Sequence, residues 1–103
     1  MNRIEQLLGF LKGTPNDCFL KHALALEYIK AGREPEAELL FKENLSFDAA
    51  YIATYYHLGK LMERAGRMNE AIDTYANGMQ QALALGDRHA YGELQAAHED
   101  LTD

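Results

Sequence analysis

The sequence has 103 residues, 48% of them hydrophobic, which suits one domain with a modest apolar core. Acidic residues outnumber basic ones by 16 to 10, and the formal net charge of −6 disfavours nucleic acids and anionic membranes as partners, because both bind basic surfaces. With a single cysteine, no apolar run long enough to span a membrane and no evident signal peptide, the sequence predicts a cytoplasmic protein.

A helical periodicity dominates the chain, and no segment alternates with a period of two. The first predicted helix covers residues 2–12 and stops at Gly13, a residue type that tolerates the left-handed conformation common after a helix end. Thr14 is expected to cap the second helix, with Pro15 in its first turn and Asp17 three residues after the cap. This helix is expected to run to about Ala31.

The remaining elements are also predicted to be helices. A third helix starts near Glu34 and Pro35 and carries apolar residues as far as Leu45, and Asp48 is expected to cap a fourth that ends near Gly66. Two more cover about residues 68–85 and 88–101. The last has an apolar stripe made of Ala90, Leu94, Ala97 and Leu101. The sequence therefore predicts an all-α fold.

The chain repeats itself at a spacing of 34 residues. The coinciding pairs are Leu24 and Leu58, Ala25 and Gly59, Gly32 and Gly66, Ala37 and Ala71, and Phe41 and Tyr75. A fixed period of this length is typical of stacked supersecondary units, here helical hairpins. Glycine inside a helix costs about 1 kcal/mol relative to alanine, so we expect close packing at Gly59 and Gly78 to offset that cost.

These landmarks resemble the tetratricopeptide repeat, whose 34 residues have the form W-x2-L-G-x2-Y, then A-x3-F, then P. The first copy matches through Leu24, Ala25, Tyr28, Ala37 and Phe41, and the second through Tyr55, Leu58, Gly59, Ala71 and Tyr75. Lys21 replaces the usual aromatic residue, Asn44 stands where a small one is expected, and the junction proline is absent at Ala49 and Leu83.

The resemblance implies a right-handed α-solenoid of stacked helical hairpins that forms a single domain over residues 1–103. Its expected parts are a half repeat at 2–17, full repeats at 18–51 and 52–85, and a C-terminal capping helix at 86–103. A terminal helix with a polar outer side is expected because the last repeat would otherwise expose its apolar side.

The resemblance also implies a concave groove, lined by the first helix of each hairpin, that binds an extended peptide or a partner helix. Carried over by position, the groove residues are Phe19, His22, Leu26, Ile29 and Lys30 in the first copy, and Ala53, Tyr56, Lys60, Glu63 and Arg64 in the second. Some members of the family bind a carboxylate with a clamp that includes lysine and asparagine. His22 and Leu26 stand at those two positions, so this clamp is not expected here.

No pattern of residues predicts catalysis, a cofactor or a metal site. The four histidines lack a paired spacing of three or four, and zinc needs several converging ligands. Cys18 lies near a helix start, which can lower a thiol pKa, but no base accompanies it. The sequence thus predicts a non-catalytic protein-interaction module. The alternative is a module that self-associates through its groove or its first helix, because two full repeats are fewer than such stacks usually need.

Overall fold

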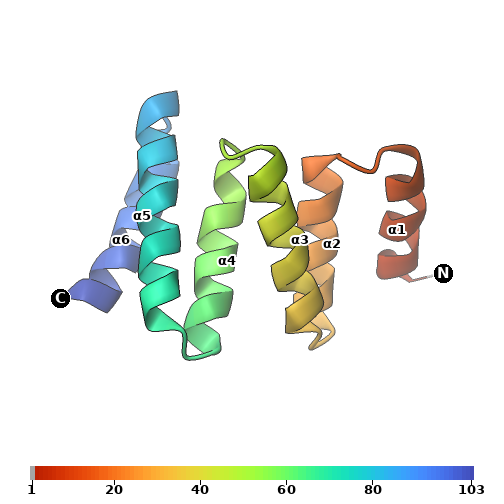
Figure 1. The fold of residues 1–103 in the computed structure, drawn as a ribbon, viewed down its shortest axis with the longest axis horizontal. Helices are drawn as coiled ribbons and strands as arrows, with labels where there is room; N and C mark the ends of the chain where they lie inside the picture. The colour runs from red at the N-terminus through yellow and green to blue at the C-terminus, as the bar shows by residue number, and fades with distance from the viewer. Residues whose placement is uncertain (1) are drawn as a thin grey trace. The chain divides into compact units, whose positions relative to one another are not determined.

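In a computed structural model, residues 2–103 are described, and within them there are six α-helices and no strand. The helices are α1 (Arg3–Gly13), α2 (Cys18–Lys30), α3 (Glu34–Phe47), α4 (Ile52–Arg64), α5 (Met68–Leu85) and α6 (Arg88–Thr102) (Figure 1). The chain divides into two compact units. The first ends at Asp48 and holds α1 to α3, and the second begins at Ala49 and holds α4 to α6. Across the described residues, no helix has the length and apolar character needed to cross a membrane.

The start of α2 differs from the sequence-based expectation. Asp17, not Thr14, caps this helix, and its carboxylate accepts a hydrogen bond from the Leu20 N–H at 3.0 Å. Thr14 instead ends α1, where its hydroxyl donates to the Phe10 carbonyl at 3.3 Å. Pro15 consequently lies in the turn between the helices and not in the first turn of α2. Both Thr14 and Asp17 are residue types that cap helices, and the sequence does not show which of them does so.

Two other predicted helix ends are also corrected. Gly13 is the last residue of α1 and does not adopt a positive φ, so its conformational freedom does not end the helix. Asp48 is the C-cap of α3, and its N–H donates to the Asn44 carbonyl at 2.7 Å. Tyr51 occupies the N-cap position of α4 and makes no side-chain capping bond. The chain between Asp48 and Ile52 is therefore a loop that the sequence pattern placed inside a helix.

The two inter-helix turns at Gly32 and Gly66 are copies of each other. Both glycines have a positive φ, 76° and 78°. In each turn the next N–H, from Arg33 or Arg67, donates to a carbonyl of the preceding helix, at 2.8 Å and 2.9 Å. Each of these arginines also donates from Nε to a glutamate three residues later at 2.6 Å. The repeat of 34 residues thus extends from the sequence to backbone geometry and hydrogen bonding.

The core of each unit includes the apolar residues that mark the repeat. In the first unit the buried apolar residues are Leu7, Leu24, Ala25, Tyr28, Ala37 and Phe41. In the second they are Tyr55, Leu58, Leu61, Met62, Ala71, Tyr75, Ala82, Leu94 and Ala97. Full burial of one large apolar side chain stabilises a fold by about 1.5–3 kcal/mol, so these side chains account for much of the stability of each unit.

The two glycines inside α4 and α5 are sites of close contact, as predicted. A Cβ added to Gly59 would lie 2.2 Å from Cε1 of Tyr75, and one added to Gly78 would lie 2.6 Å from Cβ of Tyr55. Real Cβ atoms do not approach other atoms so closely. The absence of a side chain at these two positions therefore allows α4, α5 and their aromatic residues to pack together.

Asn44 is a polar residue in the core of the first unit. It is fully buried on α3, and its Nδ2 donates to the Cys18 carbonyl at the start of α2, at 2.9 Å. Its Oδ1 is buried and has no hydrogen-bond partner among the described residues. The amide thus links two helices whose contacting residues are 26 positions apart.

Candidate interaction surface

The predicted groove residues form one stripe on α2 and one on α4, in matching registers. The α2 stripe consists of Phe19, His22, Leu26, Ile29 and Lys30, and the α4 stripe consists of Ala53, Tyr56, Lys60, Glu63 and Arg64. Each member lies three or four residues from another member of its stripe, so the members share one side of their helix. The α2 stripe belongs to the unit that ends at Asp48, and the α4 stripe belongs to the unit that begins at Ala49.

The α2 stripe is mainly apolar and partly exposed. Phe19 is 67% exposed, the largest value among the exposed large hydrophobic side chains. Leu26 and Ile29 are half-buried, and Lys30 is exposed at the end of the stripe, with its Nζ 3.0 Å from the Glu27 carboxylate. This stripe can therefore offer an aromatic ring and aliphatic surface to a partner.

His22 is held against the core and does not stand free in the α2 stripe. Its ring centroid lies 5.5 Å from that of buried Phe41 on α3, and the imidazole is half-buried. We therefore place His22 at the base of the stripe, where it supports the surface more than it projects from it.

The α4 stripe brings aromatic and charged groups together. The Lys60 Nζ lies 5.5 Å from the centroid of the Tyr56 ring and 3.6 Å from the Glu63 carboxylate. Tyr56 is half-buried, and its ring centroid is 6.4 Å from that of Tyr75 on α5. Lys60 thus already interacts with two members of its own stripe, which reduces the positive charge it presents to a partner.

Glu63 and Tyr75 form a contact between α4 and α5 that the sequence did not reveal. The Tyr75 hydroxyl donates to the Glu63 carboxylate, and the tyrosine is fully buried. Burial raises the pKa of Tyr75 far above its ordinary value, and the neighbouring Glu63 carboxylate raises it further. In the first copy the same two registers hold Ile29 and Phe41. The sequence could therefore have suggested this contact, because a tyrosine that replaces a core phenylalanine needs a hydrogen-bond partner for its hydroxyl.

His57 is a second residue near the α4 stripe that sequence reasoning passed over. Burial lowers the pKa of its imidazole, Arg64 lowers it further, and Glu93 on α6 acts in the opposite direction. Its ring is in an edge contact with Tyr56, with centroids 5.7 Å apart. The neutral imidazole is thus favoured beside the aromatic part of the stripe.

Cys18 has the opposite character from that of an activated thiol. Burial raises its pKa, and Asp48 and Asp17 add to this effect, while Lys21 opposes it. The lowered pKa that its place near a helix start suggested is therefore not found, because burial, Asp48 and Asp17 raise the pKa of the thiol. Within residues 2–103, no group of three or more His, Cys, Asp or Glu side chains is arranged to hold a metal ion.

Solved structures provide the comparison that decides the family. A crystal structure of a tetratricopeptide repeat domain protein from Salinibacter ruber is 43% identical to this chain, with a TM-score of 0.80, and the match covers 84% of this chain and 96% of the other. This chain belongs to the tetratricopeptide repeat family. Membership confirms the predicted family and, together with the six helices, the all-α helical-repeat class of the fold.

Two further solved structures are similar to this chain. A solution structure of the Salinibacter ruber domain is 44% identical, with a TM-score of 0.81, and covers 84% of this chain and 88% of that one. A protein from Bordetella parapertussis is 24% identical, with a TM-score of 0.84 and coverage of 99% and 89%, and shows the likeness of the fold alone. No model of a protein family matches the chain, and no curated protein matches it.

Proposed function

We propose that this tetratricopeptide repeat chain is a non-catalytic protein-interaction module whose α2 and α4 stripes bind a peptide or a helix of a partner protein. The observation that supports the proposal most directly is Phe19, which is 67% exposed beside half-buried Leu26 and Ile29. Exposed apolar surface of this kind is typical of interaction sites, and aromatic anchors often dominate their affinity. The family's fold is that of an interaction module.

The stripes suggest what a partner segment would contain. The apolar α2 stripe suits an aromatic or aliphatic anchor on the partner. On the α4 stripe, Lys60 already interacts with Glu63 and Tyr56, and Arg64 is exposed. We expect an acidic group on the partner to contact this end, with an effect on association that weakens as salt increases.

The proposed function involves no catalytic step, no cofactor and no metal. We also propose that the protein is cytoplasmic. The expected single domain, with its half repeat, two full repeats and capping helix, stays a prediction. The alternative is self-association through the stripes or through the first helix. It predicts a change in the mass of the particle, whereas the adaptor function predicts capture of a foreign segment.

A selection with a displayed peptide library, followed by binding measurements on variants, tests the proposal. Peptides that bind the wild-type chain should lose affinity on Phe19→Ser and Leu26→Ser. Leu39→Ser provides the matched control, because Leu39 is 61% exposed on α3, the other helix of the hairpin. Peptides that bind all variants equally would show that the stripes are not the binding surface. A Phe19→Ser chain whose mass falls from dimer to monomer would favour the alternative.

A further inference from the structure

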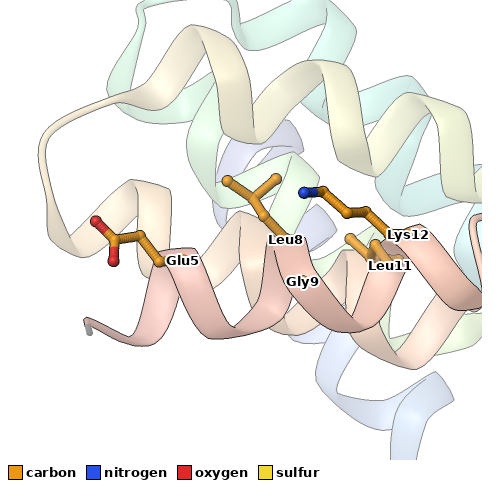
Figure 2. A pocket seen from close by; sticks show the side chains of 5 residues that line it. All are labelled: Glu5, Leu8, Gly9, Leu11 and Lys12. Carbon is orange, nitrogen blue, oxygen red and sulfur yellow. The ribbon is translucent and has the colours of Figure 1, made fainter.

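The outer side of α1 carries an apolar surface that no other helix of its unit covers. Leu7 is fully buried where α1 packs on α2, whereas Leu8 and Phe10 are 43% and 58% exposed. A shallow hollow on this side is lined by Glu5, Leu8, Gly9, Leu11 and Lys12, which we call the α1 face. Figure 2 shows that Leu8 and Lys12 project from the same side of the helix.

Gly9 is one of the residues that line the α1 face. It also lines a second hollow, with Phe10 at its edge, so that Leu8 and Phe10 project on either side of the glycine. Glycine is disfavoured in the middle of a helix, and at Gly59 and Gly78 aromatic rings explain its presence. A Cβ on Gly9 would meet no atom within 4 Å, so nothing within the described chain requires a glycine there.

Two charged residues frame the α1 face. Glu5 and Lys12 line the same hollow and are seven positions apart, with Leu8 between them. Seven residues of helix span about 10 Å, so the two charges lie about two turns apart. Neither side chain has an ion-pair partner among residues 2–103. The face thus offers one unpaired charge of each sign at equal distances from its centre.

We propose that a second copy of this chain docks on the α1 face, with the two α1 helices antiparallel. A two-fold axis between positions 8 and 9 would place Glu5 of each copy against Lys12 of the other. The same axis would place each Leu8 against the other copy's Gly9. A two-fold interface needs a surface that is complementary to itself, and this arrangement of charges, leucine and glycine meets that condition.

The expected dimer is weak. Helix α1 has 11 residues, so the contact is small compared with the ~1,200 Å² that specific stable interfaces usually bury. Association should therefore depend on concentration and be seen in the micromolar to millimolar range. Sedimentation equilibrium of the whole chain over that range should show monomer and dimer. A wild-type chain that stays monomeric at the highest concentration would overturn the proposal.

Charge reversal tests the antiparallel register. Glu5→Lys leaves two positive charges on the face and Lys12→Glu leaves two negative ones, so each variant should form its own dimer about tenfold less readily. An equimolar mixture of the two variants should associate again, because the antiparallel pair then joins opposite charges at both ends. Single variants that associate like the wild type, or a mixture that does not recover, would contradict this register.

A steric test has a matched control in α6. Gly9→Gln should remove the dimer, because the new side chain would occupy the space of the other copy's Leu8. Gly92→Gln makes the same change at a helical glycine that is equally open, on a helix with no large exposed hydrophobic side chain. Circular dichroism should show unchanged helix content in both. Equal masses for the two variants at every concentration would show that α1 is not the interface.

Discussion

The ring of Tyr75 lies against the backbone of Gly59, with Cε1 2.2 Å from the place where a Cβ would stand. One helix supplies the ring and the other supplies the space, so α4 and α5 pack at a distance that alanine would not permit. The same tyrosine donates its hydroxyl to Glu63 on α4. Its position is thus fixed both by packing and by a hydrogen bond.

We expect Gly59→Ala to destabilise the protein although alanine favours helix. Tyr75 is fully buried and donates a hydrogen bond to Glu63, so overpacking should cost about 1–3 kcal/mol in the free energy of unfolding. Urea denaturation measures this change. Gly92→Ala is the control, since a Cβ there meets nothing within 4 Å and should stabilise the protein by up to about 1 kcal/mol. Equal effects of the two substitutions would contradict the described packing.

Stability should fall at high pH in a way that depends on Tyr75. Because the folded pKa of Tyr75 is raised above its ordinary 10.0, the unfolded chain loses the phenolic proton first. The contribution of the protonated Tyr75 phenol to the free energy of unfolding is complete below pH 10.0 and is lost as the pH rises beyond it. Tyr75→Phe should cost about 1–2 kcal/mol at neutral pH, where Glu63 loses its hydrogen bond, and should make the alkaline decline shallower.

The measurement for Tyr75 is urea denaturation at neutral pH and above pH 10.0, with Tyr91→Phe as a control on α6. An alkaline decline equally steep in Tyr75→Phe and the wild type would show that the phenol is not held neutral by the fold.

A decrease in stability below neutral pH should involve His57. The pKa of His57 in the folded chain is lowered from 6.5. The contribution of the neutral imidazole to the free energy of unfolding is therefore complete above pH 6.5 and is lost as the pH falls toward the folded pKa. His57→Gln should flatten this part of the stability profile, measured by thermal unfolding across mildly acidic pH. His89→Gln, at an exposed position on α6, is the control. The stability of this variant should fall more steeply with decreasing pH than that of His57→Gln.

The Cys18 thiol should react slowly with a disulfide reagent in the folded chain. Its raised pKa leaves little thiolate near neutral pH, and the residue is partly covered. Unfolding in urea should accelerate the reaction, followed by absorbance. Asp48→Asn should accelerate it in the folded state by removing a charge that raises the pKa. A folded-state rate equal to that of the unfolded chain would rule out the proposed protection.

The helices of this protein could be predicted from sequence because each rule that places them is local. The apolar period and the glycines at 32 and 66 fix the hairpins without knowledge of distant contacts. The helix caps were harder to predict. Thr14 and Asp17 are both good capping residues, and the geometry of the turn decides which of them caps α2.

The candidate site was less predictable than the fold, because its chemistry depends on contacts across helices. The bond from Tyr75 to Glu63 joins residues 12 positions apart, and no periodic rule pairs them. Register alone placed His22 in the groove, whereas its contact with Phe41 holds it against the core. Register likewise placed Lys60 in the groove, and it could not reveal that Glu63 and Tyr56 on the same helix interact with the lysine.

The turn at Gly32, which joins α2 to α3, also affects how fast its unit can acquire its structure. In the unit that ends at Asp48, contacts join α1 to α2 and α2 to α3, each pair being consecutive in the chain. Such local contacts require little loop closure before they form, and proteins rich in them fold in microseconds to milliseconds. This unit can therefore assemble helix by helix during synthesis, before α4 to α6 have left the ribosome.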